Sequence, residues 1–296
     1  MREEIRKIQQ MMEEAQYVTD APVATSVHLG MTLRKPLLIE GHAGVGKTEV
    51  AKVMARMLGT NLIRLQCYEG LDASTALYEW NYQKQLLHIR LSENTALPVN
   101  QTEREIFSEE FLLRRPLLQA ITQHDKSPVL LVDEVDRADE EFEAFMLEVF
   151  GDWQVTIPEI GTVKATHPPY VILTSNRTRE LSDALRRRCL YLWIDYPPFD
   201  KELRIIERKV PGLDARLARE LAGFMEKLRQ MRLAKVPGVA ETLDWAQALA
   251  ALHADHLDED VIGETLGCVL KDADDIKRFR AEVVKTGLTP FLPAKP

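Results

Sequence analysis

The segment GHAGVGKT, at residues 41–48, has the residue types and spacing of a phosphate-binding loop. Its glycines let the backbone curl so that N–H groups point inward at phosphate oxygens. Lys47 can reach the β- and γ-phosphates of a nucleotide, and the hydroxyl of Thr48 can bind Mg²⁺. An apolar run precedes the loop and a helical pattern follows it, as this motif requires. We predict that a nucleotide is bound by Gly41, His42, Ala43, Gly44, Val45, Gly46, Lys47, Thr48 and Glu49.

A second group of polar residues ends another apolar run, PVLLVDE, at residues 128–134. Asp133, at the end of this predicted strand, is expected to hold Mg²⁺ together with Thr48, directly or through water. Glu134 is expected to orient or deprotonate the water that attacks the γ-phosphate. The alternative is a strand that ends in a solvated acidic turn. The order of the two motifs along the chain favours the catalytic interpretation.

Two further polar segments complete the candidate chemistry. The apolar run YVILTSN ends in Asn176, whose amide can position the same water, although asparagine also favours polar turns. Arg186, Arg187 and Arg188 precede the last apolar run, LYLWI. One of them is expected to be an arginine finger that reaches the γ-phosphate bound by a neighbouring subunit. The alternative is a solvated basic turn or a patch for another anion.

These residues need a scaffold that brings the ends of several strands together. Five short apolar runs, at 36–40, 61–66, 128–133, 170–175 and 190–194, have the character of strands buried on both faces. Helical patterns such as TEVAKVMARML and ADEEFEAFMLEVF lie between them. This alternation predicts an α/β domain with a five-stranded parallel sheet and helices on both faces.

The strand signal ends near residue 200, and only helical patterns follow. The segment DYPPF, at 195–199, contains paired prolines that block both a helix and a central strand. We therefore place a domain boundary near 197. Residues 1–197 are expected to form the nucleotide-binding domain, and residues 198–296 a small all-α lid.

Composition narrows the class of protein. The 296 residues are 45% apolar and 28% charged, which is ordinary for a soluble chain. The charged N-terminus lacks the apolar core of a signal peptide, and no apolar run approaches the ~20 residues of a membrane helix. Cys67, Cys189 and Cys268 lack CxxC spacing, which fits a reducing cytoplasm. A net charge of −8 disfavours general binding of nucleic acid.

Taken together, these motifs resemble those of an AAA+ ATPase. The resemblance assigns GHAGVGKT as Walker A, LLVDE as Walker B, TSN as sensor 1 and RRR as the arginine finger, followed by a helical lid. PLLIEGHAGVGKTEVAK and LVDEVDRADEEFEAFMLEVFGDWQVTIPEIG resemble the MoxR family within AAA+. ILTSNRTRELSDALRRRCLYLWIDYPP is similar to its CoxD-like branch, which is associated with maturation of carbon monoxide dehydrogenase. The resemblance covers roughly residues 17–250 and favours Arg188 as the finger, with Arg187 second.

The resemblance also interprets two insertions. Residues 67–100 correspond to an insert within the second helix, and residues 153–165 alternate as a hairpin does. In the family, both elements project into or over the pore of a ring; the alternative is that both are surface loops. One feature departs from the family. The stretch VPGVAETLDWA, at 236–246, lacks the sensor 2 arginine and has Thr242 in its place, with Arg232 and Lys235 as neighbouring candidates.

The resemblance implies a cytoplasmic ATPase that uses ATP and Mg²⁺ in a homo-oligomeric ring, expected to be a hexamer. Such a ring remodels or matures a client protein with the help of a partner that carries a von Willebrand factor A domain. The branch further implies metal-centre maturation of a molybdenum hydroxylase as the task.

Rival classes stay open. A scaffold that binds ATP with little turnover is compatible with the missing sensor 2 arginine. A small-molecule kinase would not depend on assembly. A GTPase would need an NKxD-type segment, and SNRT lacks the aspartate. A DNA-directed motor would need a basic pore pattern or an added DNA-binding domain, which the sequence does not show.

Overall fold

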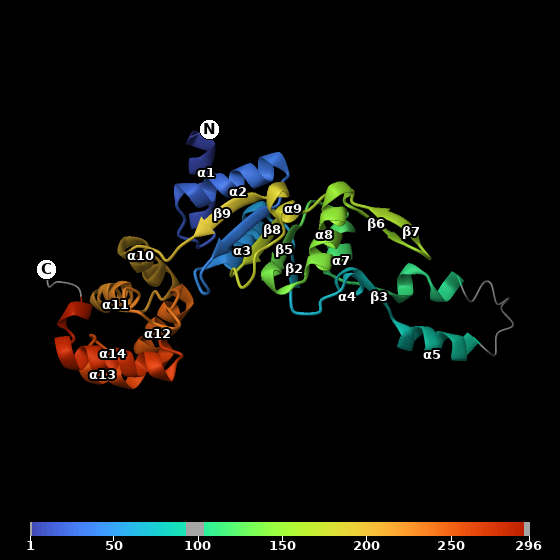
Figure 1. The fold of residues 1–296 in the computed structure, drawn as a ribbon. Helices are drawn as coiled ribbons and strands as arrows, with labels where there is room; N and C mark the ends of the chain where they lie inside the picture. The colour runs from blue at the N-terminus through green and yellow to red at the C-terminus, as the bar shows by residue number, and fades with distance from the viewer. Residues whose placement is uncertain (1, 93–103, 293–296) are drawn as a thin grey trace. The chain divides into compact units, whose positions relative to one another are not determined.

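The computed structural model describes residues 2–92 and 104–292 (Figure 1). The chain divides into two compact units, which are described separately. The first comprises Met1–Ile5, Pro22–Glu40 and Ala51–Leu192, and the second comprises Arg6–Ala21, Gly41–Val50 and Trp193–Pro296. Among the described residues, no helix has both the length and the apolar character that a membrane span needs.

A five-stranded sheet of order β2-β5-β8-β1-β9 forms the framework. Its strands are β1 Leu37–Gly41, β2 Leu62–Gln66, β5 Val129–Asp133, β8 Tyr170–Ser175 and β9 Leu190–Ile194. The pairs β2–β5, β5–β8 and β1–β8 are parallel, so the predicted parallel sheet is confirmed. Gln66 pairs in register with Asp133, and Glu40 with Ser175. The carboxyl ends of these strands therefore share one edge of the sheet.

Burial explains why these runs form central strands. Every residue of β1 and of β5 is buried, as expected where helices cover both faces of a parallel sheet. The accompanying helices are α2 Ala21–Leu33, α3 Lys47–Leu58, α7 Pro116–Ile121, α8 Glu140–Asp152 and α9 Asp183–Arg188. Helix α7 packs against β2 and β5.

Two smaller β elements lie outside this sheet. The first belongs to a segment with α4 Ala73–Leu77, β3 Tyr78–Trp80, α5 Tyr82–Ser92, the 3₁₀ turn η1 Glu109–Phe111 and β4 Leu112–Arg114. Strands β3 and β4 pair antiparallel. The predicted insert spans 67–100, and its residues 93–100 lie outside the described part. Strands β6 Gln154–Ile157 and β7 Gly161–Lys164 pair antiparallel over 154–164. Both elements extend away from the five-stranded sheet (Figure 1).

The second unit is helical where it is described beyond residue 199. Its helices are α10 Phe199–Lys209, α11 Ala215–Leu228, α12 Val239–Ala251, α13 Glu259–Thr265 and α14 Ala273–Thr286, with the 3₁₀ turns η3 Leu266–Cys268 and η4 Thr289–Phe291. The N-terminal helix α1 Arg2–Glu14 contributes Glu13, which pairs with Arg204 of α10 at 2.7 Å. The rings of Phe224 and Trp245 are fully buried and pack edge to face, with their centroids 5.0 Å apart.

Candidate functional site: a phosphate-binding loop and a carboxylate cluster

The glycine-rich loop has the backbone shape that its sequence predicts. Gly44 and Gly46 have φ angles of 74° and 91°, which glycine adopts without strain and other residues rarely do. Helix α3 begins directly after them at Lys47. The helix dipole favours an anion at this end of α3.

Lys47 is drawn into this loop. Lys47 is only 7% exposed. Its Nζ donates hydrogen bonds to the carbonyl oxygens of Gly41 at 2.8 Å and His42 at 2.7 Å. Both acceptors are neutral. A phosphate oxygen is a stronger acceptor for an ammonium group because the hydrogen bond is then assisted by charge. Phosphate oxygens can therefore compete with these two carbonyl groups for the ammonium group of Lys47.

The start of helix α12 packs directly on the loop, and both belong to the second unit. The backbone N–H of Ala240 donates to the carbonyl of Gly44 at 3.1 Å. A Cβ placed on Gly238 would lie 2.6 Å from the carbonyl oxygen of Ala43 and 2.8 Å from the Cα of Gly44. The backbone of α12 contacts the backbone of the loop here, so position 238 requires glycine, which has no side chain.

We expect Gly238→Ala to weaken both the fold and nucleotide binding. Gly238 has φ −88° and ψ −170°, which alanine can adopt, so only the new methyl group disturbs the contact. Overpacking of this kind costs about 1–3 kcal/mol. Thermal unfolding and titration with a fluorescent ATP analogue measure both effects.

Gly263→Ala in helix α13 is the matched control, because a Cβ there meets nothing within 4 Å. Alanine in an open helical position stabilises a helix by about 1 kcal/mol, so this control should melt higher. Equal melting temperatures and equal affinities in Gly238→Ala and the unmodified protein would contradict the proposed contact.

The place of the missing sensor 2 arginine is filled by a buried structural network. Thr242 is 0% exposed, and its hydroxyl donates to Oε1 of Glu202 at 2.7 Å. Arg229 binds both oxygens of the same carboxylate, at 2.5 and 2.7 Å, and its Nη2 also donates to the Thr242 hydroxyl at 3.1 Å. Thr242 is thus committed to packing α12 against α10 and α11. Arg232 and Lys235 are exposed.

The first unit holds the carboxylate predicted to bind metal. Asp133 ends β5 and is 4% exposed. The hydroxyl of Thr174, on the neighbouring strand β8, donates to Oδ1 of Asp133 at 2.5 Å and accepts the backbone N–H of Glu134 at 2.9 Å. Nη2 of Arg64, on β2, donates to Oδ2 of Asp133 at 2.5 Å. The carboxylate is therefore oriented from both sides.

Glu134 follows in an uncommon backbone conformation, with φ 55° and ψ 50°. Left-handed backbone at a residue other than glycine costs about 1–3 kcal/mol, and such residues are enriched at functional sites. The side chain is 33% exposed. It accepts hydrogen bonds from Gln66 Nε2 at 3.1 Å, Arg137 Nη1 at 3.1 Å and Asn176 Nδ2 at 3.4 Å. The structure thus brings together the two residues predicted to handle water, Glu134 and Asn176.

Asp136, for which the sequence suggested no role, anchors the loop after β8. It is 2% exposed, and its Oδ2 accepts the backbone N–H groups of Asn176 at 3.2 Å and Thr178 at 2.8 Å. These hydrogen bonds hold the backbone of Asn176 in place and so set the position from which its side chain extends. Asp136 is therefore a positioning residue for the amide that contacts Glu134.

The clustered carboxylates make this edge of the sheet electronegative. Burial, and after it the charges of Asp133, Asp136 and Glu134, raise the pKa of the Cys67 thiol to about 12. The thiol is therefore protonated and unreactive at neutral pH. The same field attracts a cation to the strand ends.

Sequence reasoning missed Arg64, Gln66 and Thr174. A signal for the first two was present, because they lie two residues apart in an otherwise apolar run and so project to one face of a strand. Their role depends on β2 lying beside β5, which the chain order does not reveal. Thr174 is the first residue of the TSN motif, but it lies within the strand and looked like an ordinary strand residue.

The three arginines form the last turn of α9, where all are exposed. The guanidinium of Arg186 lies over the ring of Tyr191, 5.9 Å from its centroid. Within the described residues, the side chains of Arg187 and Arg188 have no hydrogen-bond or ion-pair partner. Positive charge at a helix C-terminus is favourable in itself. Arg187 and Arg188 nevertheless remain accessible to a group outside the first unit.

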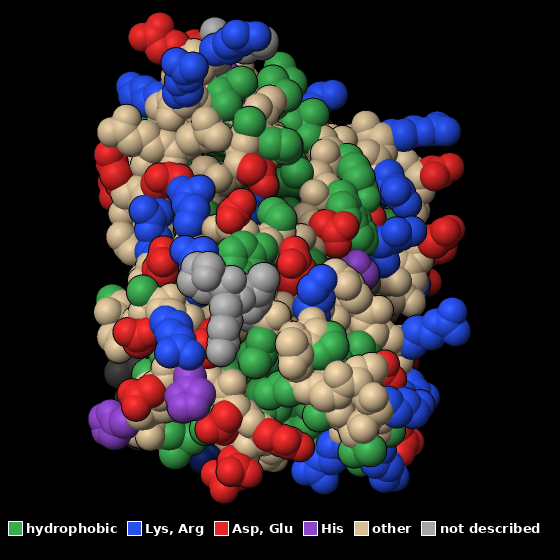
Figure 2. Space-filling model, turned by 90° about the vertical axis from the view of Figure 1, so that its left-hand side faces the viewer, with side chains coloured by type: hydrophobic (Ala, Val, Ile, Leu, Met, Phe, Trp, Pro, Cys, Tyr) green, Lys and Arg blue, Asp and Glu red, His purple; other side chains and the backbone are tan. Residues whose placement is uncertain are grey.

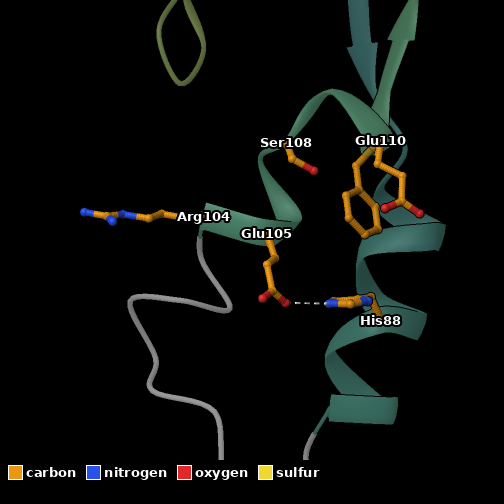
Figure 3. A pocket seen from close by; sticks show the side chains of 6 residues that line it. His88, Arg104, Glu105, Ser108 and Glu110 are labelled. Carbon is orange, nitrogen blue, oxygen red and sulfur yellow. Dashed lines mark hydrogen bonds and ion pairs between the residues drawn. The ribbon is translucent and has the colours of Figure 1, made fainter.

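A separate cavity of about 300 Å³ lies between helix α5 and residues 104–111. His88 and Glu105 face each other across it at 3.3 Å (Figure 3). Its lining residues are His88, Arg104, Glu105, Ser108, Glu110 and Phe111. None of the residues predicted to bind nucleotide belongs to it.

A family model described as AAA domain (dynein-related subfamily) matches residues 36–189, which include the loop, the carboxylates, Asn176 and the arginines. The chain belongs to this family. An uncharacterized protein of Staphylococcus haemolyticus is 25% identical to this AAA domain protein over 228 residues, covering 74% of this chain and 78% of that relative. An uncharacterized protein of Staphylococcus epidermidis is 24% identical over 206 residues, covering 67% and 70%.

Solved structures support the same fold. Two mutant forms of RuvB from Thermotoga maritima superpose with a TM-score of 0.51 each. They are 17% and 16% identical to this chain and cover 93% and 96% of it, with 75% and 76% of their own chains matched. At this identity the similarity concerns the fold alone. The predicted AAA+ fold is therefore confirmed.

Proposed function

We propose that this AAA domain protein hydrolyses ATP. The observation that carries the proposal is the contact of Glu134 with Asn176, at 3.4 Å, beside the buried Asp133. A carboxylate and an amide this close together can both contact one water molecule that lies beside them. A protein that only bound ATP would not need this pair.

The phosphate-binding loop supplies the substrate contacts in this account. Backbone N–H groups of residues 41–49 surround the phosphates, and Lys47 exchanges its carbonyl partners for phosphate oxygens. The donor set fits Mg²⁺, because a buried carboxylate and a hydroxyl are the hard oxygen ligands that this ion prefers. Thr48 and Asp133 would hold the ion, which when bound neutralises charge on the β- and γ-phosphates.

The hydrolytic step then belongs to Glu134 and Asn176. Glu134 accepts a proton from the attacking water, and Asn176 fixes the direction from which that water approaches the γ-phosphorus. The bond between the γ-phosphorus and the β–γ bridging oxygen breaks as the new bond to the water oxygen forms, and ADP leaves. Gln66 and Arg137 hold the carboxylate of Glu134 in position.

We further propose a homo-oligomeric ring, with a hexamer as the expected size. Arg188, or Arg187 after it, would reach the γ-phosphate of a neighbouring subunit. Their exposure and their lack of partners among the described residues support this role. The domain boundary near 197 separates the nucleotide-binding part from the lid in this account.

The cellular task is proposed from the resemblance to the MoxR family. It comprises remodelling or maturation of a client in the cytoplasm, with a von Willebrand factor A domain protein as partner and a molybdenum hydroxylase as the client suggested by the CoxD-like branch. Nucleic acid is not proposed as a ligand. Acidic and basic side chains are interspersed on the face drawn in Figure 2, so no basic surface covers it.

A scaffold that binds ATP but turns it over slowly is the second candidate. The buried Thr242 in place of an exposed arginine favours it, because the lid then lacks a side chain that senses the γ-phosphate. The turnover of the unmodified protein distinguishes the two candidates.

Lys47→Ala tests nucleotide binding. It removes the charge that faces the phosphates, and loss of two charge-assisted hydrogen bonds weakens ATP affinity about 100-fold. Titration with a fluorescent ATP analogue measures the change. Lys52→Ala is the control, because Lys52 is an exposed lysine on the same helix. Unchanged affinity in Lys47→Ala would sink the assignment of the loop.

A further inference from the structure

Arg64 is the residue from which we draw a further inference. It lies on β2, and its Nη2 donates both to Oδ2 of Asp133 and to Oε1 of Gln66, at 2.5 Å each. The Asp133 side chain is 5% exposed, whereas that of Arg64 is 54% exposed. A buried negative charge is thus paired with a cation that reaches it from solvent.

A buried carboxylate is costly without a positive partner, because it has lost most of its hydration. Arg64 is one such partner of Asp133 in the structure. Its side chain has room to move away, since it is 54% exposed. Gln66, itself bonded to Glu134 at 3.1 Å, accepts from the same Nη2 and helps to keep Arg64 in place.

We propose that Arg64 is a stand-in cation for Mg²⁺ at Asp133 and thereby sets the affinity of the site for the metal. This inference rests on the proposed nucleotide site. Without metal, Arg64 neutralises Asp133 and limits its repulsion of the phosphates. When Mg²⁺ binds, the guanidinium of Arg64 moves away from the Asp133 carboxylate, which then contacts the ion. Arg64 is therefore a positioning residue that weakens metal binding and supports metal-free nucleotide binding.

The test compares the Kd of a fluorescent ATP analogue in EDTA with its Kd in Mg²⁺. The Kd in EDTA divided by the Kd in Mg²⁺ reports how strongly metal and nucleotide stabilise each other's binding, because such coupling is reciprocal. In Arg64→Gln, the metal-free Kd should rise and the Kd in Mg²⁺ should stay equal or fall. Because partly exposed ion pairs contribute up to ~1 kcal/mol, the ratio should increase by up to about five-fold.

Two further variants make the result specific. Arg64→Lys keeps a positive charge and should return the ratio toward the value of the unmodified protein. Arg90→Gln removes an exposed arginine elsewhere in the first unit and should leave the ratio unchanged. A structural defect in Arg64→Gln would raise both constants equally.

An unchanged or smaller ratio in Arg64→Gln, with nucleotide still bound, would overturn the role of Arg64 alone. No binding by the unmodified protein, in either EDTA or Mg²⁺, would overturn the nucleotide site itself and the inference with it.

Discussion

Glu134→Gln is expected to leave ATP binding intact and to slow hydrolysis by about 10²- to 10⁴-fold, the range attributed to general base catalysis. Glutamine has the same shape as glutamate. It can still form hydrogen bonds with Gln66 and Asn176 if the side-chain amide groups rotate so that each donor faces an acceptor. It cannot accept a proton from water. Binding of a fluorescent ATP analogue and release of phosphate, measured on the same preparation, separate the two steps.

Glu140→Gln is the matched control for this experiment. It makes the same chemical change at an exposed position in the first turn of α8. It should hydrolyse ATP at the rate of the unmodified protein. If Glu134→Gln also kept that rate, another residue would handle the water and the role of Glu134 would be wrong.

Arg188→Ala is expected to fold, bind ATP and lose about 10³-fold in turnover, the lower range for arginine fingers. The truncated side chain is exposed and lacks partners among the described residues, so its loss should leave melting unchanged. Arg187→Ala should have a smaller effect. Retention of full turnover in single alanine variants at 186, 187 and 188 would exclude a finger on this helix.

Mixing the two inactive variants tests whether the site is shared. A junction between a Glu134→Gln subunit and an Arg188→Ala subunit can combine an intact Glu134 from one with an intact Arg188 from the other. Some turnover should therefore return in mixtures. Its absence at every ratio, while mass measurements show mixed assemblies, would count against a site completed by a neighbour.

Local patterns predicted the fold well because the strands of a parallel sheet are buried on both faces. β1 and β5 each begin with a run of apolar residues for this reason, and polar residues lie at or directly after their carboxyl ends. The loop was recognisable because its glycines and Lys47 have few substitutes for binding phosphate. Glu134 and Asn176 were predicted from position alone, and the sheet order brings them together.

Contacts that depend on the order of strands or helices could not be predicted. The pairing of Arg64 with Asp133 requires β2 beside β5, and nothing local in either strand specifies that neighbour. The close approach of Gly238 to the loop similarly depends on where α12 begins. The roles of Arg229 and Thr242 depend on three helices meeting around Glu202, a buried acid that reads as a surface residue in its helical pattern.

The measurement that tests the central claim most directly is ATP turnover per subunit as a function of protein concentration, with the mass of the assembly measured at each point. We predict that turnover per subunit rises steeply as monomers associate, because each site needs an arginine from its neighbour. A constant, nonzero turnover at concentrations where the mass is that of a monomer would contradict the claim.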